Sequence, residues 1–98
     1  MDILLSKETT RILKDHEHVR EGHYGHSYID LSKITPYVVD VSWRQDRYKI
    51  IAYCTENFGE DIGIVSFLKK QARWTHSRYQ VLYFNHEEDW FHIMMKYQ

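Results

Sequence analysis

The sequence has little of what covalent cross-linking or membrane insertion requires. It contains a single cysteine, Cys54, so an internal disulfide is excluded and a reducing compartment is favoured. No apolar run approaches the ~20 residues that a transmembrane helix needs. The first residues do not form a signal peptide, because the charged Lys7 and Glu8 follow a short apolar stretch at once. We therefore expect a cytoplasmic protein without a membrane partner.

Motifs for catalysis or cofactor binding are also lacking. The chain has four glycines, and none lies in the pattern of a phosphate-binding loop. It has no nucleophile elbow, no paired-cysteine metal motif and no kinase signature. Cys54 lies among apolar residues, which favours a small buried side chain over a nucleophile. The sequence therefore predicts no cofactor and favours a protein that is not an enzyme.

The sequence also lacks an excess of charge of one sign. The formal net charge is −1, so neither bulk attraction to nucleic acid nor charge-based mimicry of DNA is expected. Aromatic residues, in contrast, are abundant, with eight tyrosines and three tryptophans. Their apolar rings and polar ends suit binding surfaces. Because a chain this small buries only somewhat over ~60% of its unfolded surface, we expect a binding face with exposed aromatic side chains.

Alternating apolar and polar residues predict two β-hairpins. The first covers residues 37–55, with its turn in the polar run 44–47. The second has strands at residues 79–85 and 90–97, joined by a polar turn at 86–89.

Helical spacing of apolar residues predicts two helices, over residues 3–18 and 60–74. The segment around residue 28 is either a further strand at the sheet edge or the approach to a single helical turn over 31–34 that Asp30 caps. Together these elements predict an α+β fold, a single compact domain over 1–98 in which a mostly antiparallel sheet packs with two helices.

Four histidines lie close together in the sequence, His16, His18, His23 and His26. Imidazole is a good ligand for zinc, but the spacing matches no standard zinc finger, and His16 and His18 would point to different faces of a helix. A second interpretation is RNA cleavage, with His23 and His26 as acid and base and Arg20 or Arg11 on the phosphate. A solvated polar connector is the simpler explanation.

Cations and aromatic residues are interleaved over residues 69–79, at the end of the second predicted helix and just after it, a composition that suits a nucleic-acid backbone with stacked bases. The ordinary alternative is that the cations stabilise the helix C-terminus and that Trp74 belongs to the core. One basic patch forms only if this segment meets Arg44 and Arg47 in space.

We expect a non-enzymatic protein-binding factor that blocks a larger partner, plausibly a nucleic-acid-handling or defence enzyme. Phage and mobile-element inhibitors of the anti-defence type, and immunity or antitoxin proteins, are of this kind, which is an argument from association only. The anchors should be aromatic and basic: Trp43, Arg44, Arg47, Tyr53, Lys69, Lys70, Arg73, Trp74, Arg78 and Tyr79.

Three further hypotheses stay open at this point. The first is a small His-dependent ribonuclease or nucleic-acid-binding toxin, and the second is a metal-binding protein that uses the histidine cluster. The third concerns assembly, because two copies could pair as a homodimer through an edge strand or an aromatic face.

Overall fold

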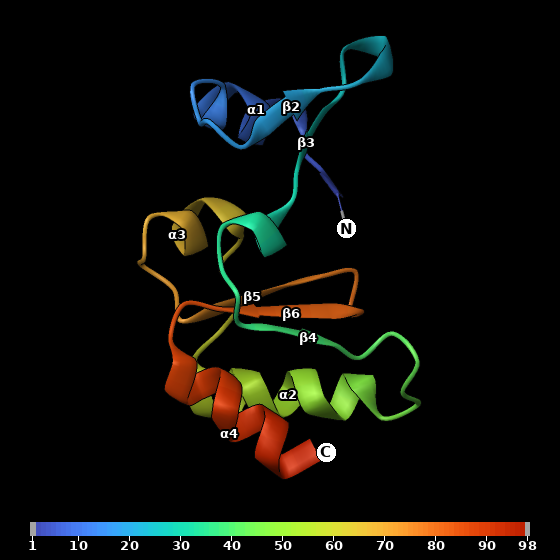
Figure 1. Ribbon diagram of the computed structural model, residues 1–98, viewed down its shortest axis with the longest axis vertical. Helices are drawn as coiled ribbons and strands as arrows, with labels where there is room; N and C mark the ends of the chain where they lie inside the picture. Colours follow the sequence, from blue (N-terminus) through green and yellow to red (C-terminus); the bar gives the residue numbers. More distant parts are fainter. Residues whose placement is uncertain (1, 98) are drawn as a thin grey trace. The chain divides into compact units, whose positions relative to one another are not determined.

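The contacts within the chain group it into two units, Met1–Pro36 and Tyr37–Gln98. The structure is a computed structural model that describes residues 2–97, except for the side chain of His23. Within those residues each unit holds one three-stranded antiparallel sheet, and the chain has four α-helices (Figure 1). The predicted α+β class is confirmed. The single domain over 1–98 stays a prediction.

The first unit is a small sheet with one helix. Strands β1 (Ile3–Leu4), β3 (Ser27–Ile29) and β2 (Val19–Glu21) lie in that order. Helix α1 (Lys7–Leu13) connects β1 to β2, and Ser6 caps it by accepting a hydrogen bond from the Thr9 N–H. Two single turns complete the unit: η1 (His23–Gly25) and η2 (Leu31–Lys33).

Two expectations for this unit need correction. The helix predicted over 3–18 covers only Lys7–Leu13, because residues 3 and 4 pair with β3 and Ser6 then starts the helix. The predicted strand near residue 28 exists, but it is the central strand of its sheet and not an edge. The helical turn capped by Asp30 forms as well, directly after that strand.

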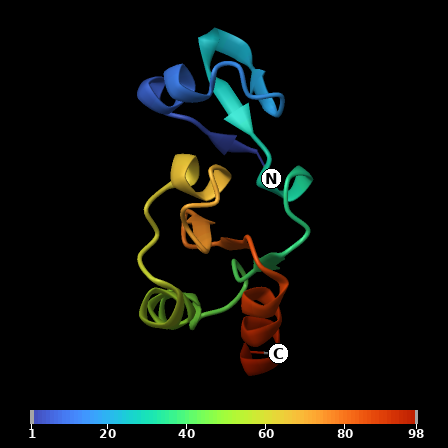
Figure 2. The same ribbon diagram turned by 90° about the vertical axis from the view of Figure 1, so that its left-hand side faces the viewer.

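The second unit is a sheet with two long helices on one face. Its strands β4 (Val38–Asp40), β6 (Val81–Phe84) and β5 (Trp74–Ser77) lie in that order. Helices α2 (Arg47–Phe58) and α4 (Glu87–Tyr97) lie side by side beneath it, and the short α3 (Ile64–Leu68) contacts β5 (Figures 1 and 2). All four residues of β6 are buried, so this strand has both faces covered.

The register explains which side chains form the core. Trp74 is opposite Phe84, and Val39 is opposite Leu82, so these four side chains share the face that α2 and α4 cover. The helices contribute the remaining buried residues of this core: Ile50, Ile51, Cys54, Phe58 and Ile93. Burial raises the pKa of the Cys54 thiol to about 12, which agrees with a small core residue and not a nucleophile.

The hairpin predicted over 37–55 is wrong in its second arm. Only Val38–Asp40 is a strand, and Arg47–Phe58 is helix α2. The segment alternates at Tyr48, Ile50, Ala52 and Cys54, as a strand would, but it also has apolar residues at helical spacing. Ile50, Ile51, Cys54 and Phe58 are the buried residues, and their spacing is helical. Ile51, which the strand pattern placed on the opposite face, belongs to the core.

The strand predicted over 90–97 is also wrong, because this segment is helix α4. The polar residues expected in a turn are its first turn, with Glu87, Glu88 and Asp89 at the positive end of the helix dipole. The strand predicted over 79–85 is confirmed as β6, but it forms its hairpin with β5. None of the helices in the described part of the chain has the length and apolar character that a membrane crossing requires.

The helix predicted over 60–74 is reduced to Ile64–Leu68. Gly59 and Gly63 have φ angles of 93° and 99°, a left-handed conformation that glycine adopts at little cost and that interrupts a helix before residue 64. At the other end, Trp74 is drawn into β5 opposite Phe84. Long-range pairing therefore overrides the local helical pattern.

Candidate functional site

The basic segment between residues 69 and 79 does not form one patch. Lys69 and Lys70 lie before β5, and the Lys70 ammonium donates to the Asn85 side chain at 3.0 Å. Arg78 and Tyr79 form the turn at the opposite end of β5. A strand of four residues separates the two groups, which at ~3.3 Å per residue is roughly 13 Å.

Arg73 is committed to the fold. Its guanidinium binds the Asp89 carboxylate with two hydrogen bonds, of 3.0 and 2.6 Å, and lies 4.9 Å from the Phe58 ring centre. Asp89 is only 4% exposed, so this pair compensates a buried charge at the start of α4. The hydrogen bonds to Asp89 raise the pKa of Arg73 above its ordinary value. Its predicted role as a binding anchor has no support from this geometry.

Trp74 is a core residue, which corrects its prediction as a surface anchor. Its side chain is fully buried, and the indole N–H donates to the Gly59 carbonyl at 2.7 Å. Tyr53 is half-buried, and its hydroxyl shares a hydrogen bond of 2.6 Å with His92 on α4. Both residues therefore join elements of the second unit to each other.

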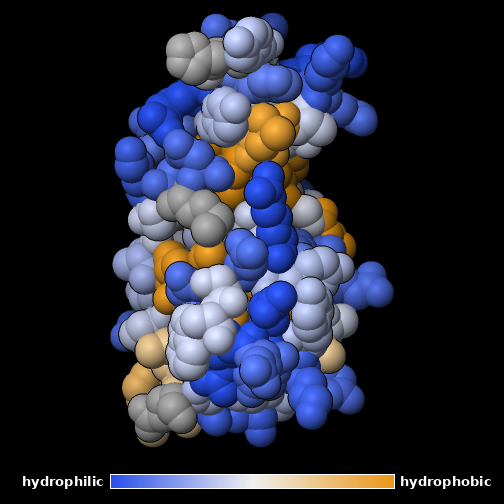
Figure 3. Space-filling model, turned by 90° about the vertical axis from the view of Figure 1, so that its right-hand side faces the viewer, coloured by the Kyte–Doolittle hydropathy of each residue, from blue (hydrophilic) through white to orange (hydrophobic). Residues whose placement is uncertain are grey.

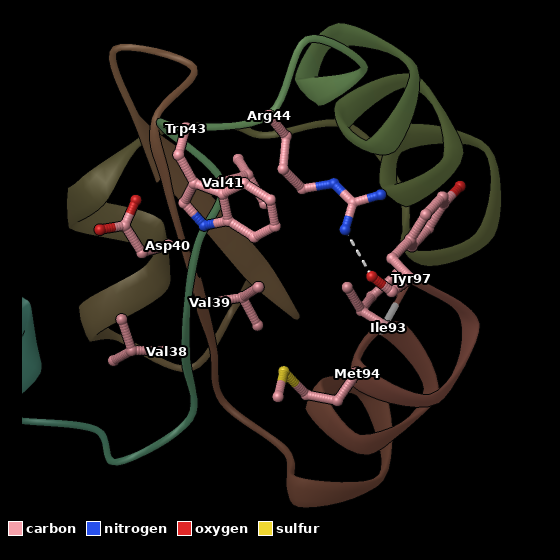
Figure 4. Close-up of a pocket in the computed structure, with 9 residues that line it drawn as sticks. All are labelled: Val38, Val39, Asp40, Val41, Trp43, Arg44, Ile93, Met94 and Tyr97. Carbon is pink, nitrogen blue, oxygen red and sulfur yellow. Dashed lines mark hydrogen bonds between the residues drawn. The ribbon is translucent and has the colours of Figure 1, made fainter.

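Arg44 holds the segment between β4 and α2 against the end of α4. Its guanidinium donates two hydrogen bonds to Asp46, at 2.8 and 2.9 Å, and a third to the Tyr97 carbonyl (Figure 4). The hydrogen bonds between the two side chains raise the pKa of Arg44 and lower that of Asp46. The same guanidinium lies 5.3 Å from the Trp43 ring centre, so it gives that indole a fixed neighbour.

Trp43 borders an apolar pocket of about 260 Å³. Figure 4 shows Val39 and Met94 pointing toward each other across this space, between strand β4 and helix α4. The Trp43 side chain is itself 75% exposed. A large, exposed and positioned indole beside an apolar cavity is a typical anchor of a protein interface.

Helix α4 extends this apolar area along its outer side. Trp90, Ile93 and Tyr97 pack toward the core, whereas Phe91, Met94 and Met95 are exposed. These three positions are neighbours on a helix surface. We call Trp43, Phe91, Met94, Met95 and the adjoining pocket the Trp43–Met94 surface.

Sequence reasoning missed most of the Trp43–Met94 surface. As a strand, 90–97 would place residues 91, 93 and 95 on one apolar face, whereas the helix buries Ile93 and exposes Phe91 and Met95. The helical spacing of Trp90, Ile93 and Tyr97 was the signal that could have identified it. Over the second unit, the face drawn in Figure 3 is mostly hydrophilic, with apolar colour in small areas. On that face, exposed apolar side chains are therefore the exception.

Two exposed tyrosines form a second group on the same unit. The rings of Tyr48 on α2 and Tyr79 in the β5–β6 turn have centres 5.4 Å apart, and Arg47 lies 4.9 Å from the Tyr48 ring centre. Arg47 and Tyr79 thus contact the same ring, that of Tyr48, whereas the Arg44 guanidinium lies 5.8 Å from the Tyr97 ring centre. Tyr48 was not among the predicted residues.

The histidine cluster belongs to the first unit. His16 Nδ1 accepts a hydrogen bond from the His18 backbone at 3.2 Å, and the side chain of His23 lies outside the described residues. Among the described side chains, no group of three or more metal-ligating residues is brought together. His26 and Arg20 do line one pocket, of about 450 Å³, together with Asp2, and Arg20 pairs with Asp2 at 2.5 Å.

Comparisons with family models, with curated proteins and with solved structures found no match for this chain. The residues and their geometry therefore carry the functional argument.

Proposed function

We propose that the chain is a non-enzymatic protein-binding factor that docks on a larger partner through the Trp43–Met94 surface. The observation that carries this proposal is the exposed Trp43 indole, held by Arg44 beside an apolar pocket. A partner of matching chemistry inserts an apolar side chain into the pocket and covers Trp43. Tryptophan at the centre of such a contact supplies a large share of binding energy.

Two further features support docking at this place. The three hydrogen bonds of Arg44 fix the segment that presents Trp43, so less conformational entropy is lost on binding. Met94 and Met95 add flexible, polarizable side chains that adapt to a partner surface. A fixed indole with adaptable neighbours combines specificity with a broad apolar contact.

The partner that we propose is a nucleic-acid-handling or defence enzyme in a reducing cytoplasm, and the effect of binding is to block it. This choice rests on the kind of protein, a small aromatic-rich chain with mixed charge. Phage or mobile-element inhibitors and immunity or antitoxin proteins are the classes that it fits.

A capture experiment tests the docking surface. The tagged chain is incubated with host lysate, with and without nuclease, and the recovered protein is identified and used for affinity measurements. We expect one protein to survive nuclease treatment, and Trp43→Ala to weaken its binding by at least ~2 kcal/mol. Ile62→Ala is the matched control, because Ile62 is an exposed apolar residue between α2 and α3.

Two results would contradict the proposal. One is recovery of nucleic acid alone, and the other is a captured partner whose affinity is the same for the wild type and Trp43→Ala. Size-exclusion chromatography of the free chain identifies a homodimer that uses the same surface, because Trp43→Ala would then dissociate it.

A second candidate function is RNA cleavage in the first unit. The observation that favours it is the shared pocket of Arg20 and His26, the predicted phosphate-binding and acid–base residues. The Asp2 carboxylate already pairs with Arg20, which reduces the attraction of that guanidinium for a phosphate. A ribonuclease of this design cleaves RNA in an assay without metal, and His23→Ala and His26→Ala each abolish cleavage. Intact RNA with the wild-type chain excludes it.

A further inference from the structure

The Tyr48–Tyr79 pair is the exposed end of a series of rings that begins in the core. The ring centres of Trp74 and His76 are 5.7 Å apart, and those of His76 and Tyr79 are 4.6 Å apart. Tyr79 then contacts Tyr48, and the two tyrosines are 47% and 57% exposed. A buried tryptophan thus supports rings that offer part of their surface to solvent.

The charges beside this pair differ from those elsewhere in the second unit. Arg44 and Arg73 each bind a carboxylate. Arg47 and Arg78 have no carboxylate partner among the residues that the structure describes. The Arg47 guanidinium donates to the Arg44 carbonyl at 3.2 Å and lies 4.9 Å from the Tyr48 ring centre. The Arg47 Nε is buried without a hydrogen-bond partner there. Each exposed tyrosine thus follows an arginine without a carboxylate partner among the described residues, and the Arg47 guanidinium contacts the Tyr48 ring.

The backbone at the turn also departs from what its residues prefer. Arg78 and Tyr79 have φ angles of 53° and 56°, and the Gln80 N–H donates to the Ser77 carbonyl at 2.9 Å. Hairpin turns with two left-handed residues favour Asn-Gly, because large side chains are strained there. A large cation and a large aromatic residue in these positions indicate that their side chains are needed at the surface.

We propose that Arg47, Tyr48, Arg78 and Tyr79 form a binding site for single-stranded nucleic acid. A base stacks on the exposed tyrosine rings, and the flanking phosphates lie against the two guanidiniums. An open aromatic platform with two separate arginines next to it in the chain fits an unpaired strand better than a phosphorylated peptide, which needs one concentrated phosphate site. The site uses none of the Trp43–Met94 surface residues, so it does not depend on the protein-docking proposal.

Fluorescence anisotropy with a labelled oligothymidylate tests the site. We expect saturable binding that Tyr48→Ala and Tyr79→Leu each weaken about 10-fold, the usual loss for one stacked base. Two phosphate contacts predict that the logarithm of the binding constant falls with the logarithm of salt concentration with a slope of about −1.4. Duplex DNA of the same length binds more weakly, because its bases are not free to stack.

Two controls separate this site from general charge and general aromatic contact. Lys69→Gln removes an exposed cation at the other end of β5, and Phe91→Ala removes an exposed aromatic ring from α4. Both should bind the oligonucleotide as the wild type does. Arg78→Asn should weaken binding about 5-fold, as expected for one exposed charge contact, and should melt no lower than the wild type because asparagine suits the turn.

Several outcomes would overturn the proposal. These are the absence of oligonucleotide binding, equal losses in Lys69→Gln and Arg78→Asn, and unchanged affinity in both tyrosine variants. Tighter binding of a phosphotyrosine peptide than of the oligonucleotide would also overturn it, and would assign the four residues to a phosphorylated protein instead.

Discussion

Strand β5 has an arginine near each end, and the two arginines have different surroundings. Arg73, just before the strand, binds the buried Asp89 with two hydrogen bonds. Arg78, in the turn after it, has no carboxylate partner among the described residues and sits in a left-handed conformation. One arginine compensates a buried charge, whereas the other is held at the surface in a conformation that costs stability.

This difference shows how a basic segment divides between folding and binding. The sequence places Lys69, Arg73, Arg78 and Tyr79 in one run, and composition alone gives each cation the same interpretation. In the structure, a carboxylate partner identifies the structural cation. A cation that has no carboxylate partner among the described residues and that lies next to an exposed aromatic residue is the candidate binding cation. Variants at Arg73 should therefore lower the stability of the fold and leave oligonucleotide binding unchanged. Variants at Arg78 should weaken oligonucleotide binding without lowering the stability.

Replacing Arg73 should have the largest effect. Arg73→Ala leaves the Asp89 carboxylate buried without its partner, so the free energy of unfolding should fall by about 3 kcal/mol, at the low end for a buried pair because Arg73 is half exposed. Denaturant unfolding measures the change. The Cys54 thiol provides a second readout, because burial raises its pKa to about 12 and it should react with thiol reagents only after opening.

The control for Arg73 is Lys69→Ala, which removes an exposed cation from the same end of the sheet and should leave the free energy of unfolding within ~0.5 kcal/mol of the wild type. Arg73→Lys keeps the charge but not the paired hydrogen bonds, so its loss should be intermediate. If Arg73→Ala were as stable as Lys69→Ala while oligonucleotide binding fell, the two ends of β5 would have the same role.

Replacing Arg78 should have a smaller effect with the opposite sign. Asparagine adopts left-handed φ angles readily, so Arg78→Asn should raise the free energy of unfolding by about 0.5 kcal/mol. Arg78→Ala removes the same charge but keeps the strained conformation, so it should not be stabilised. Thermal melts of the two variants at equal salt concentration separate the backbone contribution from the charge. A melt of Arg78→Asn below that of Arg78→Ala would show that the turn is not strained.

The sequence predicted the fold class and the strand β6 correctly, because Val81–Phe84 is a short, continuous apolar run of the kind that forms a strand buried on both faces. The sequence-based prediction failed where the apolar residues of one segment fit both the spacing of a strand and the spacing of a helix. The segments now seen as α2 and α4 both alternate and both place apolar residues at helical spacing. Burial of Ile51, and the packing of Trp90 on the same side as Ile93, decide between the two periods, and tertiary packing is not visible in a local pattern.

The candidate sites were predicted in part for the same reason. Trp43, Arg47, Arg78 and Tyr79 were identified by residue type, and the structure exposes Trp43 and Tyr79. Met94, Met95 and Phe91 were missed because their exposure depends on 90–97 being a helix. Tyr48 was missed because its contact with Tyr79 joins residues 31 positions apart in the chain. Spatial neighbours of this kind need the topology, which the sequence pattern gave incorrectly at α2.

The last predicted effect is a pH dependence at His76, between the two ends of β5. Burial lowers the pKa of His76 below 6.5, the nearby Asp61 raises it in part, and Nδ1 accepts a hydrogen bond from the Tyr79 N–H, which a protonated ring cannot do. As the pH falls, the unfolded chain therefore takes up this proton before the folded chain. The stability due to neutral His76 is complete above about pH 6.5 and is lost progressively as the pH falls through that value toward the folded pKa.

Comparing His76→Gln with the wild type measures this contribution, because the variant removes the titrating group while retaining a polar side chain. Between about pH 7.5 and pH 5.5, the wild type should lose more free energy of unfolding than His76→Gln, by under ~1 kcal/mol. Oligonucleotide affinity should follow the same trend if His76 supports the Tyr79 ring, because a protonated ring no longer accepts the Tyr79 N–H. A wild type that gains stability relative to His76→Gln as the pH falls would mean that Asp61 outweighs burial. Acid would then strengthen this end of the sheet and, with it, the support for Tyr79.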